Sequence, residues 1–384
     1  MEETFHLRWG ILGTGRIAQE FAKDLLLDPA TRGRIDFIHI LSGVASSRSE
    51  DVAQEFITAV QAPPYCQAYK NYSDLVCCPT IDVIYIATPH SHHFQNAMLA
   101  LEAGKHVLCE KSLTVNAAQA KKLFAIAEQK QRFFMEGLWT RFLPVSIEVR
   151  RLLQTGAIGT INRVFADTSL GMDPSRDFPA DDRMVVKALA GGALLDLGVY
   201  SIHWVLQTLP KENRQPTQIL SIMTKYPITG VDETTTILMK FASHTAAGPE
   251  IHATASASLR AATNADGETA AVRIQGDGGE IQILGWPWCP SRMRVIKRTP
   301  GMNNTGAVSI DKTNLLPEGV HGLCFEADEV ASCICQGLLE SPQMPWTESL
   351  IVMEITDTVR RENDLRFPEE IETLEYPFIL PPKS

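Results

Sequence analysis

A glycine-rich turn near the start of the chain limits the possible folds more than any other feature. Residues 7–12 are mostly apolar and predict a buried strand, and residues 14–27 have the apolar spacing of an amphipathic helix. The pattern G-x-G-x-x-A lies between them, at Gly13, Gly15 and Ala18. In this context the first glycine permits the tight turn, the second lets the backbone approach a pyrophosphate, and the alanine keeps the helix close to the sheet. The motif therefore predicts a dinucleotide site, with a tight turn that binds nothing as the alternative. Its expected contacts are Gly13, Thr14, Gly15, Arg16 and Ile17.

Strands and helices alternate over the first 137 residues. Further strands are expected at 37–45, 81–87, 106–109 and 132–136, and helices at 47–56, 93–103 and 116–131. Such alternation predicts an α/β fold with a doubly wound parallel sheet, the Rossmann arrangement, over residues 1–137.

The pattern changes after residue 137. Helical spacing at 144–153 is followed by alternating segments at 162–169, 218–226, 234–241, 251–259, 271–276 and 280–284. We expect residues 138–384 to form an α+β domain with a largely antiparallel, open sheet. Residues 301–317 have few periodic apolar positions and predict a loop, and 322–337 and 346–363 predict two late helices.

Composition excludes several classes of protein. The formal net charge is −10, and no block of like charges stands out, so a nucleic-acid partner is not expected. No apolar run approaches the roughly 18 residues of a membrane span, and the acidic start does not resemble a signal peptide. The eight cysteines form no C-x-x-C pair. These features together predict a cytoplasmic protein with reduced thiols, with one disulfide pair as the alternative.

The end of the second predicted strand bears on the choice of cofactor. An NAD site needs a carboxylate there for the ribose hydroxyls. The chain instead has Ser46, Ser47 and Arg48, with no acid before Glu50. Hydroxyls and a guanidinium suit a 2′-phosphate, so the sequence favours NADP. The alternative for Arg48 is a solvated residue in the first turn of a helix.

Two further segments contain residues with chemical potential. The run A-G-K-H-V-L-C-E-K covers residues 103–111 and places Lys111 just past a parallel strand, where it would face the ligand crevice. The run G-G-A-L-L-D-L-G-V-Y covers residues 191–200 and contains Asp196 and Tyr200, which would share a face of a helix.

Together with A-T-P-H-S-H-H at residues 87–93 and G-V-D-E at 230–233, these motifs resemble the Gfo/Idh/MocA oxidoreductase family over nearly the whole chain. Within it the chain is most similar to the dimeric dihydrodiol dehydrogenases and the fungal NADP-dependent D-xylose 1-dehydrogenases. The resemblance implies NADP-dependent hydride transfer at a sugar or cyclic-diol carbinol carbon, with D-xylose oxidised to its lactone as the first expectation. The alternatives are a trans-dihydrodiol or specialised-metabolite oxidoreductase, and a non-catalytic NADP-binding regulator, which would have lost the lysine and the acid–base residue.

The resemblance also implies roles for single residues. A free tyrosine, with a pKa of about 10, is a poor base at pH 7, so an ammonium such as Lys111 would help Tyr200 act as acid–base group. Asp196 would orient the substrate hydroxyl or Lys111. Trp139 would form a wall of the substrate pocket, with packing in the core as its alternative. Expected cofactor contacts also include Thr88, Pro89, His90, His93, Glu110, Lys111 and, with packing as an equal alternative, Arg141.

Four further expectations concern Ser112, residues 183–189, a metal and the oligomeric state. The family often has proline where this chain has Ser112, which excludes a prolyl cis bond. Residues 183–189 differ from the branch, which often has Asn-Pro there, so the substrate pocket could differ. His92 and His93 are adjacent on a predicted helix and have no third ligand nearby, so no metal is expected. Relatives pair through the open sheet, which implies a homodimer.

Overall fold

The chain forms two compact units. The computed structural model describes residues 4–243, 248–299, 306–313, 316 and 319–379. The first unit comprises Met1–Trp139, Leu316–Leu350 and Glu369–Ser384, and the second comprises Thr140–Leu315 and Ile351–Pro368. The sequence placed one boundary after residue 137. The structure differs because two C-terminal segments join the first unit rather than the second.

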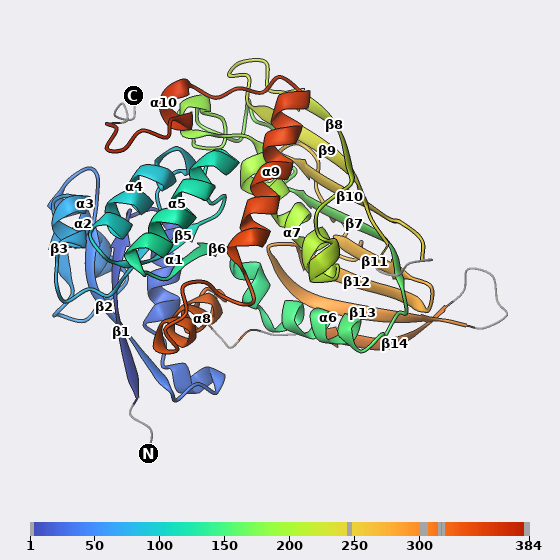
Figure 1. Ribbon diagram of the computed structural model, residues 1–384, viewed down its shortest axis with the longest axis horizontal. Helices are drawn as coiled ribbons and strands as arrows, with labels where there is room; N and C mark the ends of the chain where they lie inside the picture. Colours follow the sequence, from blue (N-terminus) through green and yellow to red (C-terminus); the bar gives the residue numbers. More distant parts are fainter. Residues whose placement is uncertain (1–3, 244–247, 300–305, 314–315, 317–318, 380–384) are drawn as a thin grey trace. The chain divides into compact units, whose positions relative to one another are not determined.

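The first unit contains the predicted parallel sheet (Figure 1). Its six strands run in the order β3-β2-β1-β4-β5-β6, and all neighbouring strands are parallel. They are β1 (Phe5–Leu12), β2 (Phe37–Ala45), β3 (Gln67–Tyr69), β4 (Val83–Ile86), β5 (His106–Glu110) and β6 (Phe134–Gly137). This order confirms the Rossmann prediction. The three-residue strand β3 was not predicted, because it is too short to show a period.

Helices pack on this sheet in two groups. The first group comprises α1 (Arg16–Leu25) and α8 (Cys324–Cys335), which pack on each other and near β1 and β2. The second comprises α3 (Tyr72–Val76), α4 (His90–Glu102) and α5 (Ala117–Lys130). Two further helices are α2 (Glu50–Ala59) and α10 (Glu369–Glu372). Side chains at the N-caps of α2, α3 and α5 (Ser49, Asn71 and Asn116) accept backbone N–H bonds.

Asp24 explains why α8 belongs to the first unit. This buried α1 side chain accepts hydrogen bonds from the backbone N–H groups of Gly322 (2.7 Å) and Leu323 (2.8 Å), just before α8 begins. A carboxylate at a helix N-terminus satisfies donors that the helix cannot, and it interacts favourably with the helix dipole. Asp328 of α8 is also paired with Arg32 (2.7 Å) and His39 (2.9 Å). Nothing in the local sequence of α8 reveals these partners, which lie about 300 residues away.

The second unit contains an eight-stranded sheet in the order β14-β13-β12-β11-β7-β10-β9-β8. Its strands are β7 (Ile161–Ser169), β8 (Gln218–Lys225), β9 (Asp232–Phe241), β10 (Ile251–Ser258), β11 (Val272–Gly276), β12 (Gly279–Trp286), β13 (Cys289–Arg298) and β14 (Gly306–Thr313). All neighbours are antiparallel except β7 and β10, so the prediction of a largely antiparallel sheet is confirmed.

The expectation of a loop at 301–317 is wrong where the structure describes that segment. Residues 306–313 form β14, which pairs with β13, and residues 301–305, 314–315 and 317 lie outside the described part. The side chains of β14 are mostly exposed, and its Asp311 pairs with Arg292 and Arg294 of β13. An edge strand held by backbone bonds and ion pairs shows no apolar period, which is why the sequence did not reveal it.

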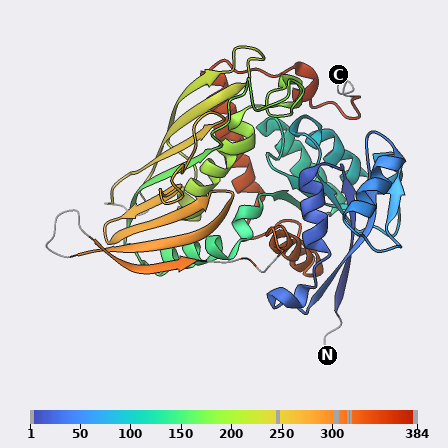
Figure 2. The same cartoon turned by 180° about the vertical axis from the view of Figure 1, so that it is seen from behind.

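Helices lie on one face of this second sheet. The helix α6 (Pro144–Gln154) packs near β13, and α7 (Val199–Thr208) packs on β7 and β10. In Figures 1 and 2 no described helix covers the other face. The helix α9 (Trp346–Glu362) is divided between the two units after Leu350. The segment Lys187–Thr208 is long and apolar enough to span a membrane by length and composition, unlike what the sequence analysis expected, but it is entirely buried as a core segment.

Candidate active site

The two motif glycines have different surroundings. Gly13 has a φ of +104°, and a Cβ atom there would lie 2.7 Å from the carbonyl oxygen of Ala87. Gly15 has an ordinary φ of −78°, and no described atom lies within 4 Å of the place where its Cβ would be. Gly15 is the N-cap residue of α1, and no side chain caps that helix. The fold itself therefore requires Gly13, whereas the open space at Gly15 and the N–H groups of α1 suit an incoming pyrophosphate.

The end of β2 lies beside this turn. The buried Ser46 hydroxyl accepts a hydrogen bond from the backbone N–H of Arg48 (3.2 Å) and one from the Thr14 hydroxyl (3.4 Å). The side chains of Ser47 and Arg48 are exposed. The first carboxylate after this turn is Glu50, in the first turn of α2. The structure thus brings the predicted pyrophosphate and 2′-phosphate residues together, and a hydroxyl–guanidinium pair without a carboxylate fits NADP.

His93 joins the carboxyl ends of β4 and β5. Its Nδ1 lies 2.8 Å from the carbonyl oxygen of Ser112, and its Nε2 lies 2.8 Å from that of Thr88. The ring is fully buried, and this burial lowers the pKa of His93 to about 4. The imidazole is therefore neutral at pH 7 and links the two loops. The Lys111–Ser112 peptide bond is cis even though serine replaces the proline of many relatives.

Buried carboxyl groups flank the half-buried Lys111. The Tyr85 hydroxyl donates a hydrogen bond of 2.5 Å to Glu110, whose other oxygen accepts from the Lys111 backbone N–H at 3.2 Å. Glu136 of β6 accepts from the Leu113 backbone N–H at 3.2 Å, and its complete burial raises its pKa to about 7. The backbone on both sides of Lys111 is therefore fixed by side chains from neighbouring strands.

In the second unit, Asp232 fixes the segment that contains Asp196 and Tyr200. Its Oδ2 atom accepts hydrogen bonds from the Leu194 backbone N–H (2.6 Å) and from the Thr235 hydroxyl (2.9 Å). Gly192 lies against the same carboxylate, since a Cβ there would be 2.1 Å from Oδ1. The segment then makes one π turn, Leu194–Gly198, and continues into α7. Burial raises the pKa of Asp232 to about 6.

Asp196 and Tyr200 each have a specific partner. Arg183 donates to both carboxylate oxygens of Asp196, at 2.6 and 3.4 Å. The Tyr200 ring lies beside Trp288, with 6.4 Å between the ring centroids, and Trp288 stacks on Trp286 at 4.7 Å. Both Asp196 and Tyr200 are largely buried, at 6% and 5% exposure. The Tyr200 phenol therefore stands beside an aromatic surface that ends at the half-exposed Trp286.

Comparison with known proteins decides the family. Residues 7–138 match a model described as "Oxidoreductase family, NAD-binding Rossmann fold", and residues 147–282 match the GFO/IDH/MocA C-terminal domain. The chain belongs to the Gfo/Idh/MocA family. This confirms the resemblance given by the sequence motifs. The chain is therefore an oxidoreductase with a dinucleotide-binding domain and a family-specific second domain.

Relatives of this Gfo/Idh/MocA chain cover nearly all of it. It is 44% identical to the D-xylose 1-dehydrogenase (NADP(+)) of Hypocrea jecorina over 96% of this chain and 95% of the relative. It is 33% identical to the trans-1,2-dihydrobenzene-1,2-diol dehydrogenase of Danio rerio, over 93% and 96%. The solved aldose-aldose oxidoreductase of Caulobacter crescentus has the same fold, with a TM-score of 0.71 at 21% identity, and covers 93% of this chain and 97% of that one.

Two further predicted site residues, Arg141 and Trp139, are buried. Arg141 is 2% exposed, its carbonyl accepts from Arg150 (2.8 Å), and its charge adds to the burial that lowers the pKa of His203. Trp139 is 7% exposed. These observations favour the packing alternative for Arg141, while the roles of both residues stay predictions. Of the other expected cofactor contacts, Thr88 and Pro89 are half-buried, and His90 is buried with its ring 5.7 Å from that of His93.

Sequence reasoning missed three residues of this family's second domain. Arg183 lies in residues 183–189, which differ from the dihydrodiol and xylose dehydrogenase branch, so the family pattern did not indicate its pairing with Asp196. Trp288 lies in the turn between β12 and β13, where the chain shows no alternation. Asp232 was noted only as part of a motif. Among the described residues, no group of three or more His, Cys, Asp or Glu side chains could hold a metal ion.

Proposed function

We propose that the chain is an NADP-dependent dehydrogenase that oxidises the anomeric carbon of an aldopyranose, D-xylose first among them, to the lactone. The main support is its 44% identity to a D-xylose 1-dehydrogenase (NADP(+)) over 96% of its length. The retention of Lys111, Asp196 and Tyr200 agrees with catalysis rather than with a regulator that has lost its chemistry.

Each of these residues has its own role in the proposed reaction. Bound NADP supplies the acceptor for the hydride that leaves the carbinol carbon. Tyr200 takes the proton of the hydroxyl during oxidation and returns it during reduction. Lys111 follows β5 at the carboxyl edge of the parallel sheet, where it would contact the cofactor. Asp196, oriented by Arg183, accepts a hydrogen bond from a substrate hydroxyl.

The aromatic side chains near Tyr200 support a ring-shaped substrate. The C–H face of a pyranose is apolar and packs well on a flat ring such as Trp288. A cyclic diol has the same kind of face, so trans-dihydrodiol oxidation is the second candidate, supported by the 33% identity to the Danio rerio relative. The anomeric carbon is favoured because the D-xylose relative is the more similar of the two.

A substrate panel tests this proposal. The wild type is assayed with NADP and with NAD on D-xylose, other aldoses and a cyclic trans-diol, with formation of reduced cofactor as the readout. We expect the highest kcat/KM with D-xylose and NADP, and loss of turnover in Tyr200→Phe while NADP still binds. Unchanged turnover in Tyr200→Phe would remove this residue from the acid–base role. Absence of turnover on every alcohol in the panel would favour the regulator.

We further propose a homodimer formed through the uncovered face of the eight-stranded sheet. Four large apolar side chains on its strands are about half exposed or more: Leu220, Ile222, Leu238 and Val308. An apolar sheet face of this kind is typical of an interface. Light scattering should give about twice the chain mass of 42.4 kDa, and Leu238→Glu should lower it toward one chain. A wild-type mass of one chain would contradict the proposal.

A further inference from the structure

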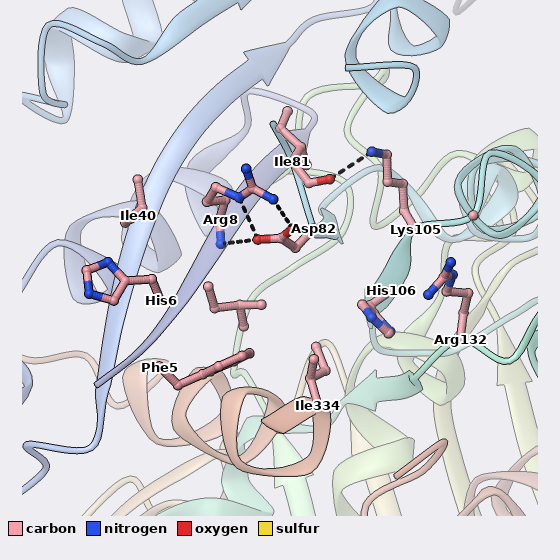
Figure 3. A pocket seen from close by; sticks show the side chains of 12 residues that line it. Phe5, His6, Arg8, Ile40, Ile81, Asp82, Lys105, His106, Arg132 and Ile334 are labelled. Atoms are coloured by element: carbon pink, nitrogen blue, oxygen red, sulfur yellow. Dashed lines mark hydrogen bonds and ion pairs between the residues drawn. The ribbon is translucent and has the colours of Figure 1, made fainter. Parts of the chain in front are cut away.

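A pocket in the first unit lies far from the glycine turn along the strands. It has a volume of about 630 Å³ and opens at the amino ends of β1, β4 and β5 (Figure 3). Arg8 belongs to the start of β1, Asp82 precedes β4, His106 begins β5, and Arg132 precedes β6. Nucleotides bind at the carboxyl ends of such strands, which is the opposite edge of the sheet. The volume is typical of a small-molecule site.

The positive charges of this pocket exceed its negative charges. Asp82 is the one carboxylate among its lining residues, and Arg8 already binds it through its side-chain Nε (2.8 Å) and its backbone N–H (3.0 Å). Lys105 is 9% exposed, and its ammonium donates to the carbonyl oxygens of Cys78 and Ile81, both at 2.7 Å. Carbonyl groups solvate this ammonium but do not neutralise it.

Arg132 adds a second cation without a counter-ion. Among the described residues, its Nε atom is buried and has no hydrogen-bond partner. Figure 3 shows its guanidinium beside the ring of His106. The Nδ1 atom of that ring accepts a hydrogen bond from the Phe133 backbone N–H at 2.9 Å, so the neutral ring keeps its proton on Nε2. Burial and the charge of Arg132 lower the pKa of His106 to about 4.

Apolar side chains complete the lining of the pocket. They are Phe5 and Leu7 of β1, Ile40 of β2, Ile81 just before β4, and Ile334 of α8. Half-buried cations without a counter-ion are costly, and an oxyanion that accepts hydrogen bonds from a guanidinium and an ammonium removes this cost. We propose that this pocket binds a small organic anion, with a carboxylate or phosphate head group on Lys105 and Arg132 and a short apolar body against Ile334. The site is separate from the proposed cofactor site, so both ligands should bind together.

Calorimetric titration with three probes tests the proposal: inorganic phosphate, hexyl phosphate and hexanoate. Saturating NADP is present throughout, so that a probe cannot report on the Ser47–Arg48 turn. We expect hexyl phosphate or hexanoate to bind, and inorganic phosphate to bind at least about tenfold more weakly, because it lacks the apolar body. The pKa of His106, followed by NMR and assigned with His106→Gln, should rise from about 4 when the probe binds.

Two variants separate this pocket from adventitious binding. Arg132→Gln should weaken probe binding at least about tenfold, whereas Arg366→Gln, which removes an 88% exposed guanidinium of the second unit, should leave it unchanged. Ile334→Glu places a negative charge in the pocket and should abolish binding, which keeps the test valid if Arg132→Gln does not fold. Absence of binding of both organic probes at about 10 mM, or equal binding in the wild type and the folded variants, would overturn the proposal.

Discussion

Replacement of Gly15 by alanine tests whether the glycine turn binds a pyrophosphate. The backbone of Gly15 has a φ that alanine adopts easily, and the new methyl group meets no described atom within 4 Å. The free energy of unfolding should therefore change by less than about 1 kcal/mol. A pyrophosphate, in contrast, must approach the backbone at this position. If the methyl group removes one charge-assisted hydrogen bond, worth about 1.5–3 kcal/mol, NADP affinity falls about 10- to 150-fold.

Gly13→Ala is the matched control in the same motif. Alanine at a φ of +104° costs about 1–3 kcal/mol of backbone strain. Its methyl group would also lie 2.7 Å from the carbonyl oxygen of Ala87. The backbone must shift to relieve this contact, at a further cost of about 1–3 kcal/mol. Gly13→Ala should therefore lose about 2–6 kcal/mol of unfolding free energy, whereas Gly15→Ala should lose little stability and much affinity.

Urea unfolding and calorimetric NADP titration measure the two quantities separately. We expect Gly13→Ala to lose stability and Gly15→Ala to lose NADP affinity. Wild-type NADP affinity in Gly15→Ala would show that no pyrophosphate approaches this residue. A loss of stability in Gly15→Ala equal to that in Gly13→Ala would show that the fold, rather than a ligand, requires both glycines.

Three further substitutions test the second unit. Arg183→Gln removes the two hydrogen bonds that Arg183 donates to the buried Asp196. We expect kcat/KM to fall only about tenfold, because the Arg183 guanidinium is half exposed. Arg183→Lys should restore part of the activity. The pKa of Asp232 is about 6 in the folded protein and about 3.9 in the unfolded chain, so the folded state binds this proton more tightly. The free energy of unfolding should therefore fall by about 3 kcal/mol as the pH rises from about 4 to 6. Asp232→Asn should flatten this part of the pH–stability curve in urea unfolding. Trp288→Ala should raise KM for the sugar about tenfold, with a smaller effect on kcat, because it removes a stacking surface beside Tyr200.

The sequence predicted elements whose own residues show a period or a cap. The strand β2 was predicted with its observed bounds, Phe37–Ala45, because its apolar run ends at turn residues. The strand β14 was missed because its mostly exposed side chains show no apolar period, and its partners in backbone pairing and ion pairing lie on β13. The position of α8 was missed for a related reason: its amphipathic pattern showed a helix, but only the Asp24 contacts decide which core it joins.

In the candidate site, too, residues with a local sequence pattern were predicted, and residues that act through distant contacts were not. Motif spacing indicated Gly13, Gly15, Lys111, Asp196 and Tyr200, because each belongs to a short run with a chemical reason for its pattern. The residues that hold them in place were not predicted. They lie on other strands or loops and contact the motifs through single hydrogen bonds or ring contacts, which leave no trace in a linear pattern. Arg183 and Trp288 are examples.

The segment from Asp196 to Tyr200 shows how a distant residue can decide local geometry. A spacing of four residues predicts one shared face of an ordinary α-helix. The structure instead has a π turn, in which the Val199 N–H bonds to the Leu194 carbonyl five residues earlier. Asp232 holds the start of this turn through the Leu194 N–H, 38 residues away in sequence. π turns inside helices are frequent at functional sites, and a turn that depends on so distant a partner cannot be recognised from the segment alone. We therefore expect Asp232→Ala, which removes both hydrogen bonds, to lower kcat even though Asp232 itself need not touch the substrate.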